Sequence, residues 1–222
     1  MGRVILIVVP LVIATTSTAL AQDAGRVYVG GLFGVSTLSA DGRSVVMPPV
    51  ASVSLYKPEN GPATDVFIGA RLGRFVSVQA NYIWNRNDLT LISSLSTPDG
   101  GSFLEQGHTS GQHAVIADVL VYFRAPQSRV RPYLSTGAGL IRLESQPGES
   151  EQSAAASHGP FTAARPALRL AVGIDVMLNG VWSFRYTYSD TISSNPVSMQ
   201  LMPAGERDLA NFQSLFGLVL RL

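Results

Sequence analysis

A short segment of this 222-residue chain carries the residue types that nucleophilic catalysis uses. Ser110 supplies a hydroxyl, and His108 supplies a base two residues before it. Glu105 or Asp99 would be the acid that orients this base, since a serine nucleophile needs both a base within hydrogen-bond reach and a third group behind it. In a strand, residues 108 and 110 would share one face, but the Gly- and Ser-rich composition here favours a loop. We therefore predict no catalytic residues and no enzyme activity.

Metal and cofactor chemistry find little support in the sequence. The chain has no cysteine, which rules out disulfides and thiol catalysis and disfavours structural zinc. His108, His113 and His158 do not have the spacing of metal ligands. We predict neither a metal nor a cofactor.

The first 21 residues have the features of a secretory signal peptide. Arg3 gives the positive start, residues 4–13 are a nearly unbroken apolar run, and Ala19-Leu20-Ala21 is a small-x-small cleavage site. We expect cleavage after Ala21, which divides the chain into a signal peptide, residues 1–21, and a barrel domain, residues 22–222. The mature domain then has 15 Lys+Arg (16 minus Arg3) against 15 Asp+Glu, a balance that argues against a nucleic-acid partner.

Eight segments of the mature chain alternate between apolar and polar residues, a period typical of β-strands. In an exported chain this period favours a barrel with lipid outside and polar groups inside. The predicted strands cover residues 26–36, 64–73, 76–85, 113–124, 133–143, 167–178, 181–190 and 211–222.

The connections between these strands alternate in length. Three are short, and one of them is Asn179-Gly180, which predicts a type I′ hairpin with positive φ at both residues. The other four are long, and two of these, around residues 97–102 and 146–159, have loop-like compositions. Short turns at one end and long loops at the other are typical of outer-membrane barrels. The sequence therefore predicts an all-β fold, an eight-stranded antiparallel up-and-down transmembrane β-barrel.

The alternation also assigns side chains to the two faces of the wall. An arginine on the lipid face at mid-bilayer costs about 2–4 kcal/mol, so the charged face is expected inside. Arg142 is assigned to it provisionally, because the glycine-rich strand 133–143 has an unclear pattern. The expected interior charges are Arg71, Asp118, Arg142, Arg169, Asp175, Arg185 and Arg221. Aromatic residues at strand ends are expected to form the interfacial girdles, namely Trp84, Phe123, Tyr133, Trp182 and Tyr188.

The C-terminal residues 215–222 look like the assembly signal of outer-membrane barrels, with Gly217 followed by apolar residues at 220 and 222. Leu222 stands where phenylalanine is usual, and Leu215 where a polar residue is usual. Arg131-Pro132-Tyr133, with glycines at 137 and 139, also looks like a strand opening of these proteins. The chain thus resembles the small eight-stranded outer-membrane barrels, the OmpA-type transmembrane domain and its OmpX-like relatives.

This resemblance implies a place in the bacterial outer membrane, with membrane lipid and lipopolysaccharide as neighbours. It also implies recognition of the C-terminal strand by the barrel-assembly machinery, and we expect a monomer. We favour a structural or surface-interaction role with a narrow polar lumen. One alternative is a lipid A acyl hydrolase or transferase, because His108-Thr109-Ser110 resembles an element of the lipid A deacylases. The other is a small anion-preferring channel, because arginines outnumber aspartates in the expected interior.

Overall fold

The computed structural model describes residues 27–39, 43–46, 51–58, 60–97, 100–147, 161–194 and 208–222. The predicted signal peptide and most of the expected loop at 146–159 lie outside these ranges. The described chain forms ten strands: β1 Val27–Ser39, β2 Arg43–Val46, β3 Ala51–Pro58, β4 Asn60–Arg71, β5 Val76–Thr97, β6 Gly100–Tyr122, β7 Val130–Pro147, β8 Phe161–Met177, β9 Trp182–Ser194 and β10 Asp208–Arg221.

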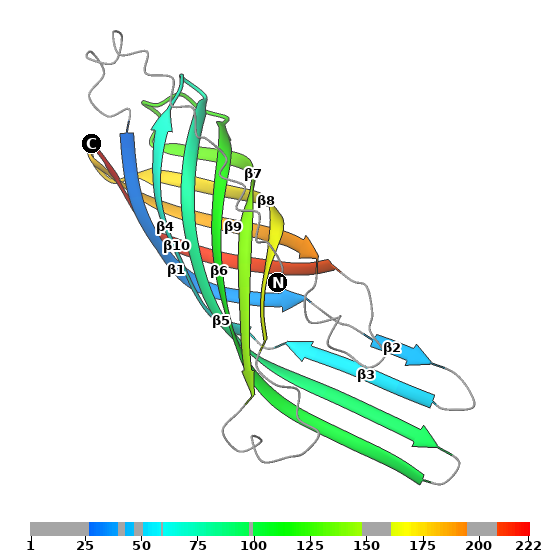
Figure 1. Ribbon diagram of the computed structural model, residues 1–222. Coiled ribbons are helices and arrows are strands. Elements are labelled where there is room, and N and C mark those ends of the chain that lie inside the picture. The colour runs from blue at the N-terminus through cyan, green and yellow to red at the C-terminus, as the bar shows by residue number, and fades with distance from the viewer. Residues whose placement is uncertain are drawn as a thin grey trace, which may run out of the picture.

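Eight of these strands close into a barrel through antiparallel pairing (Figure 1). The order around the wall is β1, β4, β5, β6, β7, β8, β9 and β10, and β10 pairs again with β1. Following paired residues around the wall from Tyr28 leads back to β1 at Leu38, a stagger of ten residues (38 minus 28). Such a stagger requires the strands to tilt against the barrel axis. The predicted fold class is confirmed.

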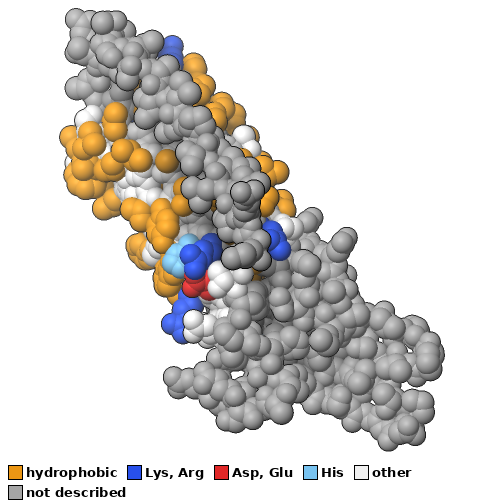
Figure 2. Space-filling view, in the orientation of Figure 1, with side chains coloured by type: hydrophobic (Ala, Val, Ile, Leu, Met, Phe, Trp, Pro, Cys, Tyr) orange, Lys and Arg blue, Asp and Glu red, His pale blue; other side chains and the backbone are white. Residues whose placement is uncertain are grey.

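Period-two alternation explains why the wall has one wet and one apolar face. Along β9, inward Arg185 and Thr187 are buried while outward Phe184 and Tyr186 are exposed. The outer surface carries exposed valines, leucines and aromatic residues, and Figure 2 shows hydrophobic side chains on one face in orange. Within the described residues, no helix is long and apolar enough to cross a membrane.

The two ends of the barrel differ. At one end, which we call the turn end, residues 72–75, 123–129 and 178–181 connect neighbouring strands. At the other, the hairpin end, β5 and β6 continue as a paired hairpin as far as Thr97 and Gly100. β3 pairs with β5, and β2 with β3, so a four-stranded sheet stands out beyond the wall (Figure 1). The prediction of a long loop around residues 97–102 was wrong, since the connection between the strands is only residues 98–99.

The β8–β9 turn also differs from its prediction. Gly180 does not adopt a positive φ, so the turn is not type I′. Instead, the side-chain Oδ1 of Asn179 accepts hydrogen bonds from the backbone N–H groups of Val181 (2.9 Å) and Trp182 (2.7 Å). An asparagine that binds its own downstream backbone forms a turn by its side chain, which explains why the Asn-Gly pair marks the right place but the wrong turn type.

Three clusters of buried apolar and aromatic residues fill part of the lumen between the polar side chains, the smallest being Leu120, Tyr122 and Tyr133. The first joins Tyr28, Leu32, Ala63, Phe67, Leu215 and Val219 on the β1, β4 and β10 side. The second joins Ile83, Ala114, Ile116, Ile141 and Ala167 on the β5 to β8 side. Leu215, which departs from the polar residue usual at its position, is completely buried in the first cluster. Apolar packing against two parts of the wall thus restricts the space that is left to the interior charges.

Candidate functional site in the barrel lumen

Arg185 of β9 lies at the centre of the first polar cluster in the lumen. Its Nε and Nη2 donate to the two carboxylate oxygens of Asp175 on the paired strand β8, at 2.6 and 2.8 Å. Its Nη1 donates to Gln79 Oε1 at 2.8 Å, and Nη2 also donates to the Tyr122 hydroxyl at 2.9 Å. Tyr122 in turn donates to Asp175 at 3.1 Å. This bidentate geometry is the strong form of an arginine–carboxylate pair.

Three aromatic rings surround the same guanidinium. Its carbon lies 5.6, 4.9 and 5.0 Å from the ring centres of Tyr28, Phe67 and Tyr133, close enough for cation–π attraction. Tyr133 can reach inward because its ring lies over Gly173 on β8, where a Cβ would collide with it. Arg185 therefore contacts side chains of six wall strands, and its cluster occupies this part of the lumen.

Arg169 of β8 is the centre of a second cluster. Its Nη1 donates to Asp118 at 2.7 Å, and its Nη2 lies 3.3 Å from the carboxylate of Asp65. All three side chains are almost completely buried. Gly137, which pairs with Asp118 across the β6–β7 boundary, leaves the space that the Asp118 carboxylate occupies. One buried cation is thus shared between two buried anions.

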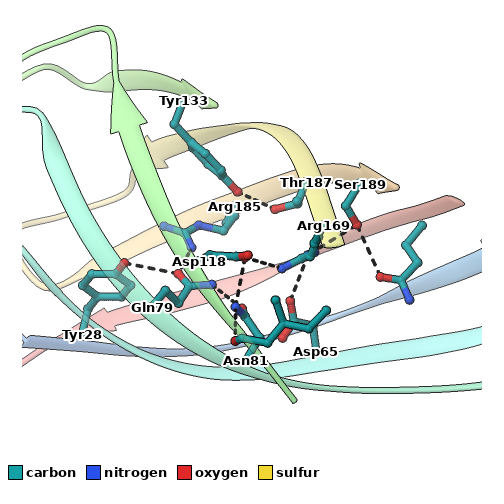
Figure 3. A network of polar contacts seen from close by, with 12 residues as sticks. Tyr28, Asp65, Gln79, Asn81, Asp118, Tyr133, Arg169, Arg185, Thr187 and Ser189 are labelled. Carbon is teal, nitrogen blue, oxygen red and sulfur yellow. Dashed lines mark hydrogen bonds and ion pairs between the residues drawn. The ribbon is translucent and has the colours of Figure 1, made fainter. Parts of the chain in front are cut away.

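Amide side chains connect the two clusters into one network (Figure 3). Gln79, which accepts from Arg185, donates to Asn81 at 2.5 Å, and Asn81 donates to Asp118 at 3.0 Å. Beyond Arg169, Ser189 donates to Gln213 at 3.3 Å. A continuous chain of hydrogen bonds therefore joins the two clusters and continues to Gln213 on β10, although Asp65 Oδ1, Asp118 Oδ1 and Arg169 Nε have no hydrogen-bond partner within the described residues.

Sequence reasoning missed several members of this network. Asp65 has the same parity on its strand as the expected interior residue Arg71, and Tyr122 has the same parity as Asp118. Parity alone would have placed both inside. The inward Phe67 on β4 and the inward Ile116 and Leu120 on β6 obscured this signal, because apolar residues then occupied both faces.

The expected interior charges fall into three groups that differ in burial. Asp118, Arg169, Asp175 and Arg185 are buried in the two clusters. Arg71 and Arg221 are half-buried at the turn end, together with the buried Arg131, which the sequence prediction did not include. Arg142 is not inside, since its side chain is 60% exposed on the outer wall and forms a 2.7 Å ion pair with Glu144.

The error at Arg142 and the error at Tyr133 have one cause. Tyr133 is 2% exposed and donates or accepts a 2.6 Å hydrogen bond with Thr187 inside the lumen, so it belongs to no girdle. Residues 133 and 142 differ in parity, so reversing the face of β7 corrects both assignments. Phe123, Trp182 and Tyr188 are exposed on the outer wall, and Trp84 is half-exposed there.

His108 and Ser110 lie on β6 and not in a loop, which corrects the sequence prediction. Both side chains point into the lumen at the hairpin end, where His108 Nδ1 is 3.2 Å from Ser145 Oγ. Ser110 Oγ has no hydrogen-bond partner in the described part of the chain. The side chains of Glu105 and Asp99 are outside that part. A base that binds a different serine, behind a protein wall, does not form a lipid-facing hydrolytic site.

The site therefore has the chemistry of a plug. The ion pairs and amides hold strands together across the lumen, and no group of metal-ligating side chains occurs within the described residues.

Comparisons with known proteins agree with this architecture. Neisserial surface protein A has a similar structure over 90% of this chain and 100% of its own, with 12% identity and a TM-score of 0.56. Ail, the attachment invasion locus protein of Yersinia pestis, shares 10% identity over 90% of this chain and 100% of its own, with a TM-score of 0.46. The outer membrane protease OmpT from Escherichia coli shares 9% identity over 88% of this chain and 96% of its own, also at 0.46.

At such identities, structural likeness concerns the fold alone, and the roles of these proteins differ. No curated protein sequence matches the chain. A family model described as outer membrane protein beta-barrel domain matches residues 6–221. The closed barrel, its apolar outer wall and its polar interior are what that description requires. The chain belongs to the outer membrane protein β-barrel domain family.

Proposed function

We propose that this protein mediates interactions at the bacterial surface through the sheet at its hairpin end. The observation that carries this proposal is the extension of β5 and β6 beyond the neighbouring wall. Among the described residues, β6 pairs with β7 from His108 onward, while its pairing with β5 continues to Gly100. With β2 and β3 this extension forms a paired sheet on a rigid support, and segments that project from such supports commonly carry binding functions.

The orientation follows from the general layout of these barrels, in which short turns face the periplasm and long connections face outward. From His113 to Phe123 the outer wall spans ten residues (123 minus 113). At about 3.4 Å per residue and about 40° of tilt this is roughly 25 Å, the height of an apolar band. We propose that this band contacts membrane lipid, and that His113 and its neighbours Trp84 and Arg142 lie at the outer headgroup level.

The lumen supports the two alternative functions less well. A channel needs a water path, whereas Arg185 and its partners occupy the lumen. A lipid A hydrolase needs its nucleophile on the lipid side, whereas His108 and Ser110 face inward. A non-enzymatic role remains the reading that the geometry supports best.

A hairpin-shortened variant tests the proposed role. Residues 91–106, whose ends pair as Leu91↔Gln106, are replaced by Asn-Gly, which leaves the barrel portions of β5 and β6 in place. Bacteria that produce the full chain should aggregate with one another and adhere to an abiotic surface faster than bacteria that produce the variant. Equal amounts of heat-modifiable protein in the outer membrane serve as the folding control.

A purely structural role makes a different prediction. If the shortened variant restores detergent resistance to cells lacking the protein, and aggregation and adherence are also unchanged, the interaction proposal is wrong. Export is measured on the same material, because the mass of the mature protein should correspond to cleavage after Ala21.

A further inference from the structure

Positive charge is compensated unevenly along the lumen. The described lumen holds five arginines, at 71, 131, 169, 185 and 221, against three aspartates, at 65, 118 and 175. Asp65 and Asp118 pair with Arg169, and Asp175 pairs with Arg185. With every group ionised, the net charge of +2 (five minus three) divides into +3 at the turn end, with Arg71, Arg131 and Arg221, and −1 around Arg169, while the Arg185–Asp175 pair is neutral.

These three arginines, the turn-end trio, have no carboxylate within ion-pair distance among the described residues. Arg131 is 2% exposed, its guanidinium lies 3.9 Å above the Tyr122 ring, and its Nε donates to the Arg124 carbonyl oxygen at 3.5 Å. Arg221 donates to Ser183 Oγ at 2.9 Å. Their like charges repel one another. Half-buried cations in such an arrangement need an anion or water as compensation.

The trio surrounds one small cavity, which is also lined by Tyr28, Tyr122 and Ser183. The hydroxyl groups of Tyr28 and Tyr122 already donate to Gln79 and Asp175, so the donors left to the cavity are the three guanidinium groups and the Ser183 hydroxyl. The floor of the cavity is the Arg185–Asp175 pair, whose carboxylate oxygens are already engaged. The cavity measures about 10 Å³, room for about one water-sized sphere. A space this small favours a monatomic anion over phosphate, sulfate or a carboxylate.

We propose that the turn-end trio binds one chloride ion, which enters from the periplasmic side. The ion balances charge that the protein itself leaves uncompensated, and it joins the ends of β4, β7 and β10 around the mouth of the lumen. A ligand that binds only the folded state raises stability in proportion to the logarithm of its concentration. Chloride should therefore stabilise the folded barrel beyond the general effect of ionic strength.

The first test is crystallographic. Crystals of the full mature protein soaked in sodium bromide should show an anomalous bromide peak between Arg71, Arg131 and Arg221. The absence of a peak there, in crystals that show bromide elsewhere on the surface, would overturn the proposal.

The second test uses stability in detergent at constant ionic strength. The thermal unfolding midpoint should be higher in sodium chloride than in sodium gluconate, whose anion is too large for the cavity. Arg71→Gln, which removes a side chain without a hydrogen bond or ion pair in the described part of the chain, should abolish the difference. Arg74→Gln, in the exposed β4–β5 turn, is the matched control and should keep it.

Two results would contradict chloride binding. One is an equal midpoint in both salts for the native protein. The other is a larger stabilisation by phosphate than by chloride at the same ionic strength, which would show an oxyanion site at the mouth instead.

Discussion

Arg185 makes its contacts with six side chains from six different strands, so a single residue joins much of the barrel wall. Removing it leaves the Asp175 carboxylate buried without its bidentate partner. Breaking a buried pair in this way costs about 3–5 kcal/mol. Arg185→Leu should therefore still insert, because the lipid face is unchanged, but should unfold at lower urea concentration in phospholipid vesicles, with a free energy of unfolding reduced by that amount.

The double variant Arg185→Leu/Asp175→Leu removes both charges but keeps apolar side chains at both positions, so it distinguishes the effect of an unpaired charge from the effect of lost packing. With both charges gone it should recover most of the lost stability. Arg142→Leu is the control, since its ion pair with Glu144 is exposed and should contribute less than about 1 kcal/mol. Equal losses in Arg142→Leu and Arg185→Leu would show that burial in the lumen does not decide the effect.

Gly137 provides a second test at the residue scale. A Cβ at this position would overlap Asp118 Oδ1 and the Ala117 carbonyl oxygen, so Gly137→Ala should displace the carboxylate that holds Arg169. Gly111→Ala is the matched control, because no atom lies within 4 Å of the Cβ it would add. Urea titration in vesicles should show a loss of stability for Gly137→Ala only. A harmless Gly137→Ala would argue against tight packing around Asp118.

The residue types alone predicted part of this site. Arg169 and Arg185 were predictable because their strands alternate cleanly, with Leu168, Leu170, Phe184 and Tyr186 on the opposite face. Which carboxylate each arginine binds was not predictable, since Asp65 is 104 positions from Arg169 in the chain. Contacts across a lumen depend on barrel closure and stagger, which local alternation does not contain.

At the scale of elements, β7 shows why one strand was assigned to the wrong face. Glycines at 137 and 139 interrupt its alternation, and they face inward where neighbouring strands need space. Because glycine has no side chain, these two positions do not show which face of the strand is polar, and the alternation cannot be followed through them. The hairpin of β5 and β6 was missed for a related reason, since its Gly- and Ser-rich sequence resembles a loop and is held by pairing with neighbouring strands.

Cysteine labelling tests the corrected face of β7. The native chain has no cysteine, so single substitutions report one position each. A lipid-soluble thiol reagent should modify Leu134→Cys and Leu140→Cys, which are exposed on the wall, and should spare Ser135→Cys and Ile141→Cys, which are buried. The opposite pattern would restore the original assignment, with Arg142 inside and Tyr133 in a girdle.

At the scale of the whole molecule, the fold was predictable because many independent signals agree on it. Alternating segments, the placement of the short turns and the C-terminal pattern all require a closed wall. The extra sheet of β2 and β3 was not predictable, because these strands are short and form through pairing with β5 beyond the wall. Local sequence thus determined the membrane part far better than the part outside it.

Closure of the lumen leads to a prediction for the molecule as a whole. Arg185, its carboxylate and the rings of Tyr28, Phe67 and Tyr133 fill the cross-section, so the native protein should show no steady ion conductance in planar lipid bilayers. Truncating two of these rings in Phe67→Ala/Tyr133→Ala removes material from the blocked level and should open a water path. Its single-channel steps should prefer anions, because five arginines and three aspartates line the described lumen.

Tyr186→Ala is the matched control for this opening, because Tyr186 lies on the same level of the wall but is exposed on its outer face. Like the native protein, it should show no ion conductance, since removing a ring from the outer face does not widen the lumen. Regular conductance steps from the native protein would contradict the plug, and they would favour a channel through the polar network. Silence of the double variant, in protein that keeps its heat-modifiable folded form, would place the barrier at the Arg169 level instead, where Asp65 and Asp118 hold the second cation.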